Sequence, residues 1–383
     1  MKPLRLLISC GEASGDLYAA ELLKELLERR PSLSAFGLGG ARAQAAGMER
    51  IVGLEQVSVI GLVEVVRKLP ALRDAMRRLC AAAETRRPNL AVLIDFSGFN
   101  LRLARRLKAL DVPVVYYVSP QVWAWRRGRI RTIRESVEEM LVILPFEREF
   151  YERENVNVRY VGHPLVDLVR TSEDREAFFT RVGLDPGRPL VMMLPGSRRR
   201  EIELHVPILR RAIEELSRVD ANLQFVVSRA PTIPPEFLTE FLMDRLGETN
   251  DRVRILEGPI YDGLAHATAA VVASGSATVE AALLGTPMVV VYRVGRASYC
   301  LGKPFVNLPF YSMVNLIAER ELVPELMQSA MTPANIVEQV MRLLDEDNAR
   351  AMRRGLADVK QKLGGGGASA RAADAVLSHF ELS

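Results

Sequence analysis

The hydrophobic and polar positions of this chain alternate between two patterns through its first half. Short continuous apolar runs are typical of strands buried on both faces of a parallel sheet, and they lie at 4–9, 35–38, 90–94 and 112–118. Longer segments with apolar residues every three or four positions are typical of amphipathic helices, and they lie at 17–29, 62–85 and 101–110. This alternation predicts βαβ units around a parallel sheet.

The second half repeats the alternation. Its apolar runs are 191–194, 223–227, 253–256, 270–273 and 288–292. Between the halves, 160–165 is typical of a last strand and turn, and the polar stretch Thr171–Asp174 predicts the start of a linker. We expect an α/β protein with two doubly wound Rossmann-like domains that face each other across a cleft. The expected boundaries are 1–170 and 171–350, with a helical tail at 351–383.

Composition narrows the class of protein. The 383 residues are 49% hydrophobic and 26% charged, which indicates a folded chain of two domains rather than a disordered one. A net charge of +4 is too small to indicate nucleic-acid binding, and the three cysteines are widely spaced, as expected in a reducing cytoplasm. We expect no secretory signal at the start of the chain, and no run of the sequence approaches the roughly 18 apolar residues of a membrane span.

The first candidate site follows the apolar run at 189–193. Leu194-Pro195-Gly196-Ser197-Arg198 predicts a tight turn between a strand and the helix at 199–216. A helix N-terminus at such a turn can bind an anion through its backbone N–H groups. Gly196 would let a phosphate approach the backbone, Ser197 would cap the helix or donate a hydroxyl, and Arg198 would add a charged fork. An ordinary turn with a solvated arginine is the alternative.

The second candidate site follows the apolar run at 270–273. Small residues open the next predicted helix there: Ser274, Gly275, Ser276 and Thr278. They suit phosphate or ribose hydroxyls, and Glu280, one turn into the helix, would accept both hydroxyls of a ribose. A carboxylate that only stabilises the helix dipole is the alternative. Together the two turns favour a site for a nucleotide diphosphate.

Carboxylates at strand ends are the candidates in the first half. Glu12 and Asp16 flank the turn after the first strand, although Asp16 as a helix cap is the alternative there. Asp95 ends the apolar run at 90–94, where it would act as general base on a substrate hydroxyl. The alternative for Asp95 is a cap for the helix that begins near Phe99. No cluster of His, Cys and Asp supports a metal site.

Two further segments combine apolar and basic residues. Tyr116–Trp125 holds both tryptophans and precedes five arginines, which favours a solvated helix packed by its aromatics over a nucleic-acid site. The helix at 62–85 and the residues before it suit an interface with a membrane or with acyl chains. The residues proposed for this patch are Val59, Ile60, Val63, Arg67 and Lys68. Core packing with a basic solvent face is the alternative.

Ten segments, in their order along the chain, resemble the lipid-A-disaccharide synthase family. They are Gly11–Asp16, Val63–Val65, Ile94-Asp95 with Phe99-Asn100, Tyr117–Arg126, Leu144–Glu147, Val161–Pro164, Leu194–Arg198 with Glu201, Ser274–Glu280, Asn315–Ala318 and Pro324–Leu326. Tyr117–Arg126, with the sequence YVSPQVWAWR, is the most specific, whereas LPGSR also occurs in other GT-B transferases. The chain departs from the family at Ser97-Gly98, where a proline often follows the aspartate.

The resemblance implies a GT-B fold and an inverting hexosyl transfer. The donor would be UDP-2,3-diacylglucosamine, the acceptor 2,3-diacylglucosamine-1-phosphate, and the products a β-1,6-linked disaccharide phosphate and UDP. Asp95 would be the base and Arg198 would stabilise the leaving diphosphate, without a cofactor or a divalent ion. Residues expected at the acceptor or in the cleft are Glu12, Ser14, Asp16, Gln121 and Asn315.

The implied partners are the two acylated substrates and the inner face of the inner membrane, on which a cytoplasmic protein would lie peripherally. No nucleic acid is expected, and a homo-oligomer is left open. Two rivals share the nucleotide-binding half, a muramyl-type N-acetylglucosaminyltransferase and a UDP-N-acetylglucosamine epimerase. YVSPQVWAWR and the helix at 62–85 argue against both. A non-enzymatic nucleotide-sugar-binding regulator is the remaining alternative, and it would not need Asp95.

Overall fold

The computed structural model describes residues 4–57, 62–123, 128–242, 251–295 and 309–381. The chain forms two compact units, one made of Met1–Pro164 with Leu363–Ser383 and the other of Leu165–Lys362. The first boundary therefore lies six residues before the expected one at 170. The expected tail at 351–383 is divided, because its first part belongs to the second unit and its last 21 residues return to the first.

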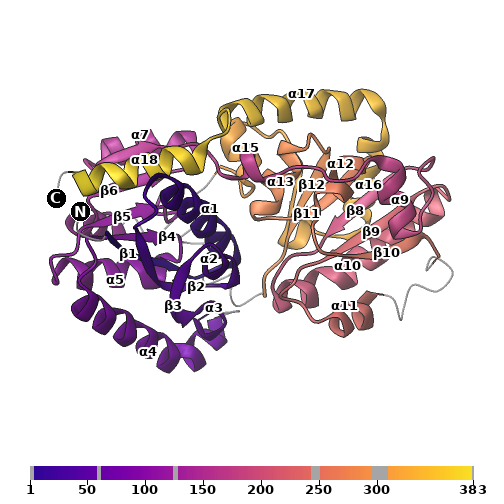
Figure 1. The fold of residues 1–383 in the computed structure, drawn as a ribbon. Helices are drawn as coiled ribbons and strands as arrows, with labels where there is room; N and C mark the ends of the chain where they lie inside the picture. Colours follow the sequence, from indigo (N-terminus) through magenta and orange to yellow (C-terminus); the bar gives the residue numbers. More distant parts are fainter. Residues whose placement is uncertain (1–3, 58–61, 124–127, 243–250, 296–308, 382–383) are drawn as a thin grey trace. The chain divides into compact units, whose positions relative to one another are not determined.

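Seven parallel strands form the sheet of the first unit within the described residues, in the order β3-β2-β1-β4-β5-β6-β7 (Figure 1). Their bounds are β1 Arg5–Cys10, β2 Ser34–Gly39, β3 Met48–Gly53, β4 Leu90–Ile94, β5 Val114–Tyr117, β6 Glu139–Val142 and β7 Val158–Tyr160. The strand order reverses between β1 and β4. In open parallel sheets, ligands bind beyond the carboxyl ends of the strands at such a switch point.

Helices cover both faces of this sheet. They are α1 Ala13–Arg29, α2 Ala41–Ala45, α3 Leu54–Val57, α4 Leu62–Arg86, α5 Ser97–Lys108, α6 Arg129–Ser136, α7 Pro145–Arg153 and α18 Ala368–Glu381. One buried cluster joins alternate strand residues, such as Leu93 and Tyr116, to α4 and α5. On the other face α18 lies beside α1 (Figure 1), and Arg371 of α18 donates from Nε to the carbonyl oxygen of Val161 at 2.9 Å.

The second unit repeats this architecture with six parallel strands among the described residues, in the order β10-β9-β8-β11-β12-β13. Their bounds are β8 Leu190–Leu194, β9 Gln224–Arg229, β10 Val253–Glu257, β11 Ala269–Ala273, β12 Met288–Tyr292 and β13 Glu325–Met327. The switch point lies between β8 and β11. The helices are α8 Leu165–Leu168, α9 Arg175–Val182, α10 Arg199–Val219, α11 Pro235–Leu242, α12 Tyr261–His266, α13 Ser276–Leu283, α15 Met313–Ala318, α16 Pro333–Leu344 and α17 Glu346–Lys362, with a short 3₁₀ helix at Gln328–Ala330.

The α/β class and the parallel strands predicted from continuous apolar runs are confirmed. The strands β3, β6 and β13 were not predicted. The expected linker at Thr171–Asp174 is wrong, because Ser172 belongs to the second unit and donates to Asp262 from both its backbone N–H, at 2.7 Å, and its hydroxyl, at 2.8 Å. Helix α1 begins four residues before the expected Leu17, so most of the predicted turn is its first turn.

Candidate active site

Asp95 lies directly after β4, at the switch point of the first sheet. Its backbone is left-handed with φ 45°, and the next residue, Phe96, has φ 48°. Val118, directly after the neighbouring strand β5, is also left-handed with φ 63°. Non-glycine residues in this region cost on the order of 1–2 kcal/mol each and cluster at functional sites. Strain therefore marks two adjacent strand ends beside the candidate base.

Polar side chains surround the backbone of Asp95. The Asn100 amide donates from Nδ2 to the carbonyl oxygens of Asp95, at 2.9 Å, and Ile94, at 3.1 Å. The Tyr116 hydroxyl donates to the same Asp95 oxygen. Asp95 precedes Phe96, the N-cap residue of α5, so it does not occupy the cap position that the structural alternative required.

Arg129 is a cation of this site that the sequence did not single out. It lies at the start of α6 and donates from Nη1 to the Ser97 hydroxyl at 2.8 Å. Burial raises the pKa of Tyr116 well above its ordinary value, the charge of Asp95 raises it further, and the Arg129 guanidinium opposes this. The charges of Asp95 and Arg129 therefore act on the same buried hydroxyl, that of Tyr116. Ser97, where the chain departs from the family pattern, accepts a hydrogen bond from Arg129 and so orients the guanidinium.

The candidates after β1 divide into two groups. Glu12, the N-cap residue of α1, is exposed, and Ser14 is half-buried in the first turn. Asp16 is buried, and its carboxylate accepts from the backbone N–H groups of Gly40 at 2.7 Å, Arg42 at 3.1 Å and Ala43 at 3.2 Å. Asp16 therefore holds the start of α2, and its place at the acceptor stays a prediction.

The loop after β5 carries Gln121, whose side chain is exposed. Beneath this loop, the buried Glu147 carboxylate accepts from the indole N–H of Trp123 at 3.1 Å and from the backbone N–H of Leu144 at 3.1 Å. Burial raises the pKa of Glu147 to about 7. The YVSPQVWAWR motif thus contributes a strand end and an anchored loop as far as Trp123. The solvated helix predicted from the aromatic residues and arginines is therefore wrong for this part of the motif.

Glu201 occupies the first candidate anion site of the second unit. Its carboxylate accepts from the backbone N–H groups of Ser197, at 2.9 Å, and Arg198, at 3.1 Å. It also pairs with the Arg198 guanidinium at 2.9 Å. Gly196, with φ 119°, is required because a Cβ there would lie 2.4 Å from a Glu201 oxygen. These N–H groups therefore face a carboxylate of the chain itself, and the half-exposed side chain of Arg198, the N-cap residue of α10, pairs with the same carboxylate.

The second candidate anion site lies at the start of α13, directly after β11. Among the described residues, a Cβ built on Gly275 would meet no atom within 4 Å, so the backbone at this glycine is not covered by their side chains. The Thr278 hydroxyl donates to the Gly275 carbonyl at 2.7 Å, and that of Ser274 donates to the Tyr311 carbonyl at 3.1 Å. Burial raises the pKa of the half-buried Glu280 to about 7, and a hydrogen bond with Ser276 opposes the shift.

Both predicted ligand sites thus lie at switch points, Asp95 at that of the first sheet and Arg198 with the α13 N-terminus at that of the second. The sequence profile of the lipid-A-disaccharide synthetase family matches residues 6–377. The chain belongs to this family. It is a glycosyltransferase of lipid A biosynthesis, and the suspected resemblance is confirmed.

Relatives in the family match nearly end to end. The lipid-A-disaccharide synthase of Solibacter usitatus is 47% identical over 379 residues, which cover 98% of both chains. That of Myxococcus xanthus is 45% identical over 376 residues, 98% of this chain and 97% of its own.

Solved structures share the fold at low identity. The calicheamicin glycosyltransferase CalG4 has a TM-score of 0.60 at 18% identity and covers 100% of this chain and 99% of its own. The UDP-GlcNAc 2-epimerase from Neisseria meningitidis has a TM-score of 0.67 at 12% identity, and the match covers 98% of this chain and 100% of its own. These likenesses confirm the GT-B fold and, at such identities, nothing more.

Asn315, which belongs to one of the family motifs, is bonded within the second unit. Asn315 is buried, and its amide accepts from the backbone N–H groups of Leu322, at 2.8 Å, and Val323, at 2.9 Å. It donates to the Val323 carbonyl and to Glu325. The Asn315 amide therefore fixes the loop between α15 and β13, and its place in the cleft stays a prediction.

His205 of α10 is a buried residue that supports the loop of the first candidate anion site, a role that the sequence did not predict. The buried imidazole contacts the Pro195 carbonyl through Nδ1 at 2.7 Å, and its Nε2 accepts from the backbone N–H of Arg293 at 3.0 Å. It therefore links the loops that follow β8 and β12. The sequence places His205 on the apolar side of a helix, which gives no signal of this role.

The proposed acyl patch is largely outside the described residues. Val59 and Ile60 lie beyond them, and for Val63, Arg67 and Lys68 only the backbone of α4 is described. Among the helices described, none combines the length and apolarity of a membrane span. Among the same residues, no group of three or more His, Cys, Asp or Glu side chains is placed to hold a metal ion.

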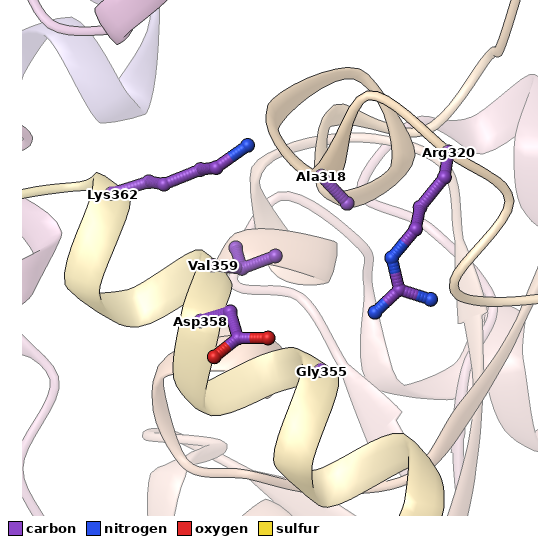
Figure 2. A pocket seen from close by; sticks show the side chains of 6 residues that line it. All are labelled: Ala318, Arg320, Gly355, Asp358, Val359 and Lys362. Carbon is purple, nitrogen blue, oxygen red and sulfur yellow. The ribbon is translucent and has the colours of Figure 1, made fainter.

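A small pocket of about 160 Å³ lies between α15 and α17 (Figure 2). Its lining residues are Ala318, Arg320, Gly355, Asp358, Val359 and Lys362. None of the predicted site residues lines it. The sites at the strand ends are therefore distinct from this pocket.

Proposed function

We propose that this family member transfers 2,3-diacylglucosamine from UDP-2,3-diacylglucosamine to 2,3-diacylglucosamine-1-phosphate. The products are a β-1,6-linked lipid A disaccharide phosphate and UDP. The observation that carries the proposal is the strained turn at Asp95, which places a carboxylate at the switch point of the first sheet. A binding protein for nucleotide sugars has no need of a base held at that point.

In this proposal Asp95 is the general base. Its carboxylate takes the proton of the acceptor 6-hydroxyl while that oxygen attacks the anomeric carbon of the donor. The bond from this carbon to the diphosphate oxygen breaks on the opposite face, and its electron pair leaves with UDP. The anomeric configuration is therefore inverted. Glu12, Ser14 and Gln121, which follow β1 and β5, are the candidates for holding the acceptor.

The second unit binds UDP in this proposal. The Arg198 guanidinium and the N-terminus of α13 receive the diphosphate, whereas the α10 backbone groups stay with Glu201. Glu280 accepts the ribose hydroxyls. The developing charge on the leaving group is balanced by Arg198 and backbone dipoles, so transfer needs no cofactor and no divalent ion.

We further propose that the protein lies peripherally on the cytoplasmic face of the inner membrane. Both substrates carry acyl chains, which partition into a bilayer. The segment at 57–72 supplies apolar residues together with Arg67 and Lys68 for contact with acidic lipids.

Mass spectrometry of the reaction products tests the proposed activity. The full chain is incubated with both acylated substrates in the presence of EDTA, and we expect a disaccharide phosphate together with UDP. A parallel incubation with UDP-N-acetylglucosamine alone tests the epimerase alternative, for which we expect no epimer. Recovery of both acylated substrates unchanged by the folded enzyme, with and without Mg²⁺, contradicts the proposal.

A further inference from the structure

The turn at Asp95 needs external support. Asp95 and Phe96 are consecutive left-handed residues, with φ 45° and 48°, and neither is glycine. Such residues persist only where the surrounding structure holds them in place, because each costs on the order of 1–3 kcal/mol. The neighbouring contacts therefore show what keeps the carboxylate in its position.

Asn100 provides the first support. It is buried in the first turn of α5, and its Nδ2 donates to the carbonyl oxygens of Ser9, Ile94 and Asp95 at 3.1, 3.1 and 2.9 Å. Its Oδ1 accepts from the Ser9 hydroxyl at 2.7 Å. One amide thus links the ends of β1 and β4 to the Asp95 carbonyl.

Tyr116 of β5 provides the second support. Its side chain is fully buried, and its hydroxyl donates to the carbonyl oxygen that Asn100 also contacts. The backbone N–H of Asp95 in turn donates to the Tyr117 carbonyl at 3.2 Å. Both peptide groups that flank the Asp95 Cα are therefore fixed. The direction of its Cα–Cβ bond is fixed with them, because these two groups define φ and ψ.

Phe96 fixes the far side of the turn. Its ring lies against Gly11, so closely that a Cβ on Gly11 would come within 2.1 Å of a ring carbon. The ring also stacks on Phe99 with a centroid separation of 5.3 Å. The left-handed turn is thereby held between the ends of β1 and β4.

We infer that Asn100 and Tyr116 are positioning residues that hold Asp95 in the orientation needed to take a proton from the acceptor hydroxyl. This inference rests on the proposed role of Asp95 as the base. Neither side chain touches the substrate in this assignment, since both are buried and contact the backbone of Asp95. Their effect on the rate is exerted through Asp95, whose backbone they hold.

A double-mutant cycle tests the inference. In the full chain, Tyr116→Phe keeps the ring and removes the hydroxyl, and we expect kcat to fall about 10-fold because small misplacements of a reacting group are costly. The Kd for UDP, measured by calorimetry, should stay within twofold. In the Asp95→Asn background the same change should have no further effect on kcat, because contacting residues that act as a unit are not additive.

Tyr160→Phe on β7 of the same sheet is the matched control and should leave kcat within twofold. Asn100→Ser is the second variant and should reproduce the loss of kcat with unchanged UDP binding. An equal loss from Tyr116→Phe in both backgrounds overturns the inference, since the hydroxyl then acts independently of Asp95. A wild-type kcat in Tyr116→Phe overturns it as well. Normal turnover of Asp95→Asn alone removes the proposed base, and with it any group to position.

Discussion

At the scale of single residues, Glu280 is a carboxylic acid near the midpoint of its titration at neutral pH. Burial raises its pKa to about 7, above its ordinary value, so the group is ionised above that pH and gains a proton below it. Only the ionised form accepts both ribose hydroxyls. We therefore expect UDP affinity to fall as the pH falls from 8 to 6, up to about 10-fold by the change in ionised fraction.

Calorimetry at the two pH values measures this effect. UDP also titrates in this range, so Glu280→Gln serves as the matched control that keeps the titration of the ligand and removes that of the protein. We expect the ratio of the two Kd values to be smaller in the variant than in the parent protein. Equal ratios in both proteins would show that Glu280 has no part in the pH dependence of binding.

Arg198 belongs to the same scale. Its guanidinium is 48% exposed and pairs with Glu201, so the pair adds little to stability in water. Its proposed role is to stabilise the transition state. The loss of one charged donor to a leaving group raises the activation free energy by about 3 kcal/mol. We expect Arg198→Ala to lower kcat by roughly 100-fold with an almost unchanged melting temperature. A kcat like that of the parent enzyme would end this role.

At the scale of elements, continuous apolar runs identified the buried strands well. A strand that is covered on both faces is apolar at nearly every position, so its sequence differs clearly from that of a loop. The strands that the sequence missed lack this signal. β3 carries Glu49 and Arg50, and β6 begins with Glu139, whose buried carboxylate is paired with Arg159 and His379. A short strand that carries charges, whether at the sheet edge like β3 or between two strands like β6, does not differ from a loop in sequence alone.

The sequence also predicted the turns at which the candidate site lies, but not which polar atoms are already occupied. Three residues of the family motifs show this: each bonds to backbone groups of its own unit. They are Asp16, Asn315 and Glu201. The partners of Glu201 are three and four positions away, whereas folding brings Ala43 to Asp16 from 27 positions away. A pattern of residue types carries no record of such distant partners.

The last helix offers a test at this scale. α18 packs on α1 and β4, and its residue Val376 is completely buried. Val376→Ala removes about two methylene equivalents from a packed site, and we expect the free energy of unfolding of the full chain to fall by about 1–3 kcal/mol in urea. Asp374→Asn, at an exposed pair with Arg29, is the control and should change it by less than about 0.5 kcal/mol. Equal effects would contradict the packing of α18 as a core element.

At the scale of the whole molecule, two doubly wound units each place candidate chemistry at the switch point of a parallel sheet. The division of labour proposed for them assigns the acceptor to the first unit and UDP to the second. Family membership is secure across nearly the whole chain, and the likeness to epimerases and transferases is one of fold. The catalytic assignment therefore depends on the residues at the strand ends rather than on the architecture.

Membrane contact is also a property of the whole molecule. We expect a variant with Val59, Ile60 and Val63 changed to serine to sediment less with liposomes that contain acidic lipids, because apolar insertion and basic charge act together. Liposomes of neutral lipid provide the control for the charge contribution. Full retention of the variant on acidic liposomes would assign these residues to the core instead.

The assignment of Asp95 as the general base is tested most directly by measuring single-turnover sugar transfer in the Asp95→Asn variant. Calorimetric titration of the same variant with UDP accompanies it. The variant keeps the shape of the side chain and removes the proton acceptor. We predict that it folds, binds UDP like the parent enzyme and forms the disaccharide about 100-fold more slowly or worse. A folded variant that binds UDP and transfers the sugar at close to the parental rate would contradict the assignment of Asp95 as the base.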